Sequence, residues 1–279
     1  MRDLNSAIKL NNGVEMPVLG FGTYSQPPRD RIINALEVAI NTGYRLIDTA
    51  TIYQNEHYIG KSLAVMLTKV PREEFFITTK VWKDAMRIGA VRESLEESLE
   101  KLRLDHVDLL LIHRPLSAFN VAAWHVLEDL HEEGLARAIG VSNFLVKHLE
   151  ALAETSTTVP AVNQIELHPF FYRKELVNYC NERGIIVESY SPIALGKRLD
   201  DARLKQIADA HEKTPAQVVL RWHLQHGFVP IPRSLDAAHI KENAAVFDFE
   251  LSKVEIADMD AWNEDFHVIG ADPDEPDFR

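Results

Sequence analysis

The chain has 279 residues, of which 46% are hydrophobic, so it can bury a large core as one α/β barrel or as two smaller domains. Its formal charge of -12 argues against a surface that tracks nucleic-acid phosphates, and no apolar run is long enough to predict a membrane span. Its single cysteine, Cys180, excludes an internal disulfide, and without an apparent secretory signal a cytoplasmic location is expected.

The first predicted element is a short hairpin. Ile8-Lys9-Leu10 and Val14-Glu15-Met16 flank Asn11-Asn12-Gly13, and these turn residues tolerate positive φ. We expect this hairpin to close the floor of a barrel.

Apolar strands and amphipathic helices then alternate without a linker. Strands are predicted to start near Val18, Tyr44, Phe75, Val107, Ala136, Ala161, Ile185 and Phe228. Most starts lie about 24 to 32 residues apart, which is close to one βα unit, and the last gap of about 43 leaves room for an extra helix. The pattern predicts a single domain over residues 1–279, a (β/α)8 TIM barrel with an N-terminal β-hairpin and extra C-terminal helices.

Several helices have identifiable boundaries and faces. An apolar stripe of Ile88, Val91, Leu95, Leu99 and Leu102 predicts a helix that packs on the sheet, with its glutamates in solvent. Thr214-Pro215-Ala216-Gln217 and Ser252-Lys253-Val254-Glu255 are capping boxes, and the second opens a final helix through Trp262. The acidic stretch Asp272-Pro273-Asp274-Glu275-Pro276-Asp277 is expected to be a surface segment.

Three familiar motifs are incomplete. Gly20-Phe21-Gly22-Thr23-Tyr24-Ser25 has Ser25 in place of the third glycine of a dinucleotide fingerprint. Gly140-Val141-Ser142-Asn143-Phe144 lacks the closing glycine of a nucleophile elbow, which disfavours a serine hydrolase. His223 and His226 have no carboxylate or cysteine at metal-ligand spacing and are interpreted as helix-surface or packing residues.

Three successive strands each end in an ionisable residue, namely Asp48, Lys80 and His113, and Tyr53 follows the first of them. In a parallel barrel these side chains meet at the C-terminal mouth. We expect Lys80 to lower the pKa of the Tyr53 phenol, Asp48 to hold Lys80, and His113 to donate a hydrogen bond to a substrate oxygen. Such a set would protonate an alkoxide as it forms, which is what carbonyl reduction requires.

Motifs spread over nearly the whole chain carry a resemblance. They are Leu19-Gly20-Phe21-Gly22-Thr23-Tyr24, Ile47-Asp48-Thr49-Ala50 with Tyr53, Thr79-Lys80 with Trp82, His113 with Pro115, Gly140-Val141-Ser142-Asn143, Asn163-Gln164-Ile165-Glu166-Leu167-His168-Pro169 and Tyr190-Ser191-Pro192. In this order they resemble the aldo-keto reductase superfamily, nearest to the bacterial branch that includes 2,5-diketo-D-gluconate reductases. The resemblance implies a barrel that binds an extended nicotinamide dinucleotide without a Rossmann domain.

Carried onto this sequence, the resemblance implies that Tyr53 is the general acid, Lys80 and Asp48 are its tuning pair, and His113 orients the substrate. Ser142, Asn143 and Gln164 would hold the cofactor carboxamide, and Tyr190 would stack on the nicotinamide ring. The other cofactor contacts implied are Gly22, Thr23, Ser191, Pro192, Arg233, Ser234, Leu235, His239, Glu242 and Asn243.

Two departures from the family pattern concern specificity. Arg233 replaces a usual lysine, His239 replaces a usual arginine, and Asp236 adds a negative charge, so we expect NADPH to be preferred with NADH use possible. Arg114 replaces a usual tryptophan. It would either recruit a substrate carboxylate or turn outward into a surface ion pair.

The substrate pocket is expected to contain Tyr24, Ile52, Trp82, His113 and Arg114, with Phe119 beside them. The sequence thus predicts an NAD(P)H-dependent reductase of aldehydes and ketones, such as sugar-derived dicarbonyls or methylglyoxal-like aldehydes, acting as a monomer. The alternative is a cofactor-binding redox sensor or regulatory subunit with slow turnover. A metal-dependent hydrolase would need a His-x-His and carboxylate pattern that is missing, so no metal is expected.

Overall fold

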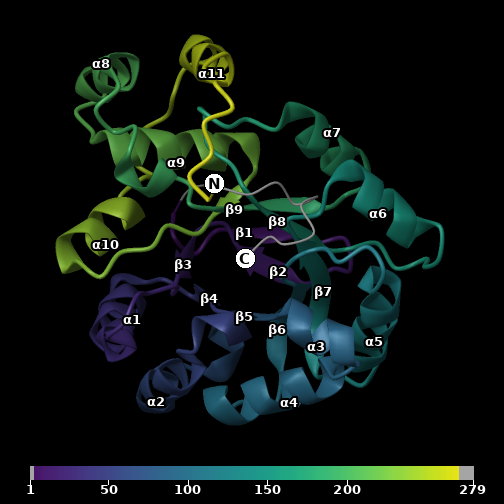
Figure 1. The fold of residues 1–279 in the computed structure, drawn as a ribbon. Helices are drawn as coiled ribbons and strands as arrows, with labels where there is room; N and C mark the ends of the chain where they lie inside the picture. Colours follow the sequence, from purple (N-terminus) through teal and green to yellow (C-terminus); the bar gives the residue numbers. More distant parts are fainter. Residues whose placement is uncertain (1–2, 270–279) are drawn as a thin grey trace.

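The computed structural model describes residues 3–269, and its central feature is a ring of eight parallel strands surrounded by helices (Figure 1). The strands are β3 (Gly20–Gly22), β4 (Leu46–Asp48), β5 (Phe76–Val81), β6 (Val107–Ile112), β7 (Ala136–Ser142), β8 (Val162–Glu166), β9 (Ile186–Tyr190) and β10 (Val229–Pro230). Neighbours in sequence are neighbours in the sheet. The Gly22 backbone N–H donates to the Pro232 carbonyl at 3.2 Å, which joins β3 to the segment after β10. The predicted (β/α)8 barrel is confirmed.

At the closure of the ring, two positions on β3 leave no room for a side chain. A Cβ atom on Gly20 would lie 2.5 Å from Leu46 and 2.7 Å from Ile231. A Cβ atom on Gly22 would lie 2.9 Å from the Ile231 carbonyl oxygen. These glycines therefore serve strand packing, since neither has positive φ.

The hairpin consists of β1 (Ala7–Lys9) and β2 (Glu15–Pro17), each one residue from the prediction. It lies across the ring in the axial view of Figure 1. Gly13, in its turn, has φ of 91°, as the turn requires. Leu10 and Met16 are buried and pack in one cluster with inward residues of the barrel strands, so the predicted floor is confirmed.

The barrel interior changes from apolar to polar along its axis. Side chains two residues apart on a strand point to the same face. Leu46 in the apolar cluster is therefore followed by Asp48, Leu111 by His113 and Val162 by Gln164. The apolar layer packs against the hairpin, and the polar layer faces the C-terminal ends of the strands.

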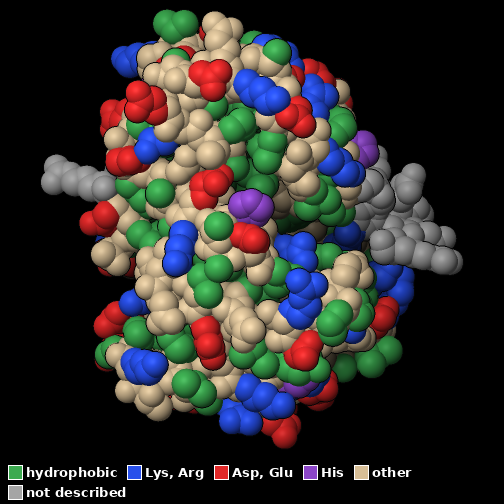
Figure 2. Space-filling model, turned by 90° about the vertical axis from the view of Figure 1, so that its left-hand side faces the viewer, with side chains coloured by type: hydrophobic (Ala, Val, Ile, Leu, Met, Phe, Trp, Pro, Cys, Tyr) green, Lys and Arg blue, Asp and Glu red, His purple; other side chains and the backbone are tan. Residues whose placement is uncertain are grey.

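The helices cover the outside of the ring. They are α1 (Ile32–Thr42), α2 (Glu56–Met66), α3 (Lys83–Ile88), α4 (Val91–Leu102), α5 (Asn120–Glu132), α6 (Val146–Ala153), α7 (Lys174–Glu182), α8 (Ala202–Ala210), α9 (Pro215–His226), α10 (Ala237–Ala244) and α11 (Lys253–Asp260). No helix within residues 3–269 combines the length and the apolar character that a membrane span needs. On the face drawn in Figure 2, basic and acidic side chains are intermixed.

The predicted helix stripe needs one correction. Val91, Leu95, Leu99 and Leu102 are buried on α4, but Ile88 is 79% exposed at the end of α3. Gly89, with φ of 71°, ends α3, so the helical phase does not continue from Ile88 into α4.

The C-terminal part of the barrel agrees with the predicted boundaries in most respects. Both capping boxes are present, at Thr214 and at Ser252. The extra helix expected in the long gap before β10 is present, because α8 and α9 both lie there. The last helix, α11, ends at Asp260 and does not reach Trp262. The acidic stretch at 272–277 lies outside the described residues.

Candidate active site

The centre of the site is the ammonium group of Lys80, which is completely buried near the end of β5. Its Nζ atom donates to Asp48 Oδ1 at 2.7 Å and to the Thr49 carbonyl at 2.8 Å. It lies 3.5 Å from Tyr53 Oη. The three donors of the ammonium group therefore have three acceptors, which is what a buried charge requires.

Local structure places Tyr53 over this ammonium group. Thr51–Tyr53 form a 3-10 helix after β4, and Gln54 then adopts a left-handed conformation with φ of 54°. The Thr51 hydroxyl donates to the Lys80 carbonyl at 3.1 Å, and Arg29 Nε donates to the Tyr53 carbonyl at 3.0 Å. This loop is thus held from both sides.

Two residues that support the loop were not singled out from the sequence. The Asn55 side chain donates to the Thr23 carbonyl at 2.8 Å and accepts from the Thr49 hydroxyl at 2.9 Å, which joins the loops after β3 and β4. Glu56 accepts from the Thr79 hydroxyl at 2.7 Å. Both are buried and lie two and three residues after Tyr53, and the polar run that follows Tyr53 was the signal that could have identified them.

Lys80 lowers the pKa of the Tyr53 phenol, as expected, but it does not set the net direction of the shift. Burial raises the pKa of the phenol above its ordinary value, and the nearby Lys80 ammonium lowers it only in part. Asp48 adds a smaller upward contribution. The phenol is therefore protonated at neutral pH, and Lys80 is placed to stabilise the phenolate that proton donation would leave.

His113 lies beside the phenol as a neutral imidazole. Its ring centroid is 5.6 Å from that of Tyr53 and 5.0 Å from that of Trp82, both edge to face. Burial, followed by the charges of Lys80 and Arg114, lowers the pKa of His113 well below its usual value. Its Nδ1 atom is buried and has no hydrogen-bond partner among the described residues. Leaving Nδ1 unprotonated costs less than burying an N–H there, so the ring proton is assigned to Nε2.

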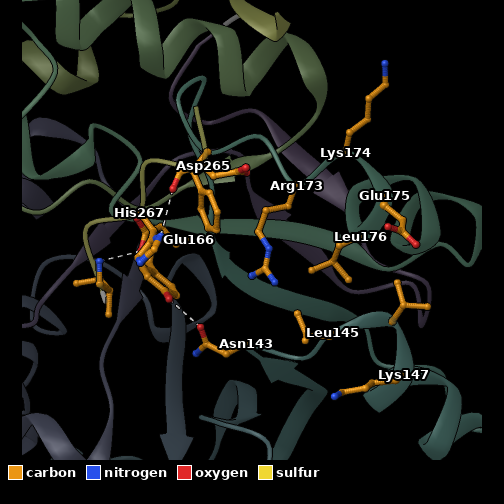
Figure 3. Close-up of a pocket in the computed structure, with 14 residues that line it drawn as sticks. Asn143, Leu145, Lys147, Glu166, Arg173, Lys174, Glu175, Leu176, Asp265 and His267 are labelled. Atoms are coloured by element: carbon orange, nitrogen blue, oxygen red, sulfur yellow. Dashed lines mark hydrogen bonds between the residues drawn. The ribbon is translucent and has the colours of Figure 1, made fainter. Parts of the chain in front are cut away.

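The residues implied for the cofactor carboxamide meet at the ends of β7, β8 and β9. Asn143 Nδ2 donates to the His113 carbonyl at 3.0 Å, and its Oδ1 accepts from the Tyr190 hydroxyl at 2.7 Å (Figure 3). The Ser142 hydroxyl donates to the Gln164 carbonyl at 2.8 Å. This network anchors the Tyr190 ring.

Gly22 and Thr23 lie where β3 meets the segment after β10. Thr23 is buried, and its hydroxyl donates to the Asp48 carbonyl at 2.8 Å. A Cβ atom on Gly22 would also lie 3.4 Å from Arg233 Cβ. The strand thus packs closely against the segment expected to bind the adenosine end. Ser191 and Pro192 follow Tyr190, and Ser191 has φ of 48°.

The remaining cofactor candidates lie in the segment before α10 and along this helix, where Leu235 is partly buried and Asn243, in the last turn, is buried. The Ser234 hydroxyl accepts from the Asp236 backbone N–H at 3.0 Å. Asp236 in turn caps α10 by accepting from the backbone N–H groups of Ala238 and His239 at 2.8 and 3.0 Å. Glu242 accepts from the Thr214 hydroxyl at 2.7 Å. Asp236 and Glu242 therefore have structural partners besides any ligand.

The expected substrate residues gather around Tyr53. Its ring lies 5.2 Å from the Tyr24 ring, edge to face. Tyr24 and Ile52, the residue before Tyr53, are 48% and 40% exposed and form an accessible apolar rim, and Phe119 is also exposed. The Arg114 guanidinium lies 5.8 Å from the centroid of the Trp82 ring, which places it at this rim.

A cavity of about 610 Å³ is lined in part by Asn143 and Tyr190. Its walls come from the loops after β7 and β8 and from the C-terminal segment, and Arg173 points into it while Lys174 points away (Figure 3). Buried Glu166 accepts from the backbone N–H groups of Val268 and Ile269 at 2.6 and 3.0 Å. One strand-end carboxylate thus ties the C-terminal segment to the barrel, which the sequence did not reveal.

Sequence reasoning also missed Glu188, which is fully buried on β9. Gln164 Nε2 donates to Glu188 Oε2 at 2.6 Å and to Asp48 Oδ2 at 2.8 Å. The sequence feature that could have identified Glu188 is its position as a single acidic residue directly after the apolar run Ile185-Ile186-Val187.

Comparison with known proteins gives one consistent family. Residues 18–264 match the model of the aldo/keto reductase family. The chain is 46% identical over 272 residues to glyoxal reductase of Bacillus subtilis, with 98% of each protein covered. It is 43% identical over 272 residues to methylglyoxal reductase DkgA of Salmonella typhimurium, covering 96% of this chain and 97% of that protein. A crystal structure of a Bombyx mori aldo-keto reductase in complex with NADP is 34% identical and superimposes with a TM-score of 0.90, covering 97% of this chain and 96% of that one. The chain therefore belongs to the aldo/keto reductase family.

Proposed function

We propose that this protein reduces small aldehydes and ketones to alcohols with a nicotinamide cofactor, with Tyr53 as the proton donor. The observation that carries the proposal is the group formed by Asp48, Lys80 and Tyr53, in which Lys80 Nζ lies 2.7 Å from Asp48 Oδ1 and 3.5 Å from Tyr53 Oη. Family membership and the glyoxal and methylglyoxal reductases among the relatives support carbonyl reduction.

The proton step uses groups that this chain supplies. His113 Nε2–H donates a hydrogen bond to the carbonyl oxygen and holds it near Tyr53. Negative charge develops on that oxygen as the carbon is reduced, and the Tyr53 hydroxyl transfers its proton there. The phenolate that remains is stabilised by the Lys80 ammonium, which Asp48 keeps charged and in place.

The residues present fit the cofactor at its nicotinamide end. Tyr190 is half-buried, and the bond from its hydroxyl to Asn143 holds the ring that would stack on the nicotinamide. The Asn143 amide also donates to the Ser142 hydroxyl, which donates to the Gln164 backbone carbonyl, so these three residues adjoin the Tyr190 ring. When bound there, the reduced cofactor supplies the hydride that carbonyl reduction needs.

At the adenosine end, Arg233 and Ser234 are the residues that would bind a 2'-phosphate. A guanidinium can form two parallel hydrogen bonds to a phosphate, so we propose NADPH as the preferred cofactor. Asp236 opposes this only weakly, because its carboxylate already accepts two backbone N–H groups of α10. The NADP complex of the Bombyx mori relative supports a phosphorylated cofactor.

The rim indicates the substrate class. An apolar and aromatic rim around one proton donor suits a small carbonyl compound. Arg114, over the face of Trp82, would favour substrates that carry a carboxylate or a second carbonyl oxygen. We therefore place dicarbonyls such as methylglyoxal and sugar-derived diketo acids first among the candidates.

The test is cofactor oxidation with a panel of neutral and acidic carbonyls, run with NADPH and with NADH. We expect turnover with NADPH, and the Tyr53→Phe variant should lose on the order of 10² to 10⁴ in kcat while it still binds cofactor. Cofactor binding without turnover across the panel would favour the redox-sensor alternative, and a Tyr53→Phe rate equal to that of the parent would remove Tyr53 as the acid.

A further inference from the structure

A carboxyl group lies beneath the active site, and no step of the proposed chemistry uses it. Glu188 is fully buried on β9, two residues before Tyr190, and it pairs in register with Gln164 on β8. Its Oε1 atom has no hydrogen-bond partner among the described residues, and Oε2 accepts from Gln164 at 2.6 Å. A buried carboxyl group is costly, so its presence at this position needs a reason.

The bonds of Gln164 define the orientation of its amide. Asp48 is a carboxylate paired with Lys80, so only the amide nitrogen of Gln164 can face it. That nitrogen also donates to Glu188, so both of its hydrogens are engaged on the barrel side. No hydrogen bond reaches Gln164 Oε1 from the described residues, and this oxygen is left as the acceptor for a ligand.

Glu188 can take part in this arrangement because it stays neutral. Burial, and then the negative charge of Asp48, raises the pKa of Glu188 to about 8. Lys80 pairs with Asp48 and only partly offsets that shift. Asp48 and Lys80 are the charged groups that face Glu188, and at neutral pH they form one ion pair beside a protonated carboxyl group.

We propose that Glu188 is a positioning residue, whose carboxyl group fixes the amide of Gln164 so that Oε1 faces the carboxamide N–H of a bound nicotinamide. This inference rests on the proposed function. A single bond to Asp48 would leave the amide free to pivot about that bond. The second bond, to Glu188, fixes the amide plane and so prepares the acceptor before the cofactor arrives.

The test compares two variants. Glu188→Leu fills the space but has no acceptor for the Gln164 amide, whereas Glu188→Gln retains a side-chain oxygen that can accept its hydrogen bond. Cofactor binding is measured by fluorescence titration with NADPH and with 2',5'-ADP, which lacks the nicotinamide. We expect Glu188→Leu to weaken NADPH binding roughly three- to tenfold, the effect of one hydrogen bond, and to leave 2',5'-ADP unchanged. Glu188→Gln should restore most of the NADPH affinity. Gln164→Leu should cause the same loss, and combining it with Glu188→Leu should add little.

Three outcomes would overturn the proposal: unchanged NADPH binding in Glu188→Leu, equal weakening for NADPH and 2',5'-ADP, or losses that add fully in the double variant. Equal weakening would mean that Glu188 only supports the barrel. Failure of the parent protein to bind NADPH or to reduce any carbonyl would instead count against the proposed function, and that result is read before any variant is compared.

Discussion

The buried ion pair of Lys80 and Asp48 should control stability as strongly as activity. Lys80→Met keeps the length of the side chain and removes its charge. Asp48, which is 2% exposed, would lose its 2.7 Å bond to Lys80 and retain only the 2.8 Å bond from Gln164. Removing one partner of a buried pair leaves an uncompensated charge, and this typically costs about 3–5 kcal/mol.

The free energy of unfolding measured in urea at neutral pH should therefore fall by about 3–5 kcal/mol in Lys80→Met. The double variant Asp48→Asn/Lys80→Met has no buried charge at this pair and should be more stable than Lys80→Met alone. Asp48→Asn completes the double-mutant cycle. All variants alter the group proposed to be catalytic, so stability and not activity is the quantity to measure.

The pH dependence gives a second check on the same pair. In Lys80→Met the pKa of Asp48 in the folded state lies above its unfolded value, because burial raises it and the offset from Lys80 is gone. A raised carboxyl pKa destabilises the protein as pH rises between the unfolded and the folded values. The stability deficit of the variant should therefore shrink as pH is lowered below the folded-state pKa of Asp48 toward its unfolded value. A variant within about 1 kcal/mol of the parent at neutral pH, or a double variant that shows the full sum of both single losses, would refute the reasoning.

Three further predictions follow from individual contacts. Since burial raises the pKa of Tyr53, kcat for reduction should stay constant through mildly alkaline pH and fall only as the phenol ionises. An identical fall in the residual rate of Tyr53→Phe would show that another group titrates. Arg114→Met should raise KM for acidic carbonyls more than for neutral ones, and equal effects on both would remove its role in recruiting anions. Gly140→Ala would place a Cβ atom 2.5 Å from the Val162 carbonyl and 2.8 Å from Leu111. The free energy of unfolding, measured with heat or urea, should therefore fall by about 1–3 kcal/mol. An unchanged value would mean that the neighbouring strands can move apart to accept the methyl group without cost.

The barrel was predictable because its signals are local. Strand starts follow from apolar runs, and capping boxes at Thr214 and Ser252 follow from four-residue patterns. Ile88 was misplaced because periodicity alone could not show that Gly89 interrupts the helix. The motifs that indicated the family were also local, and the family match over residues 18–264 confirms it.

Part of the site could be anticipated for the same reason. Asp48, Lys80 and His113 each end an apolar strand, and parallel strands bring such ends together. Glu188 and Glu166 were missed because their roles depend on partners far away in the chain. Glu188 accepts a hydrogen bond from Gln164, which also donates to Asp48, 116 residues away. Glu166 binds backbone N–H groups more than 100 residues away.

The sequence by itself determined that this chain forms a β/α barrel with ionisable groups at one mouth. Each of the strand, cap and strand-end patterns lies within a few neighbouring residues. Tertiary structure decided how those groups behave. It buries the Tyr53 phenol enough to raise its pKa despite Lys80, and it keeps Glu188 neutral beside Asp48. Desolvation and through-space charge depend on which side chains enclose a group, and only the folded barrel determines that.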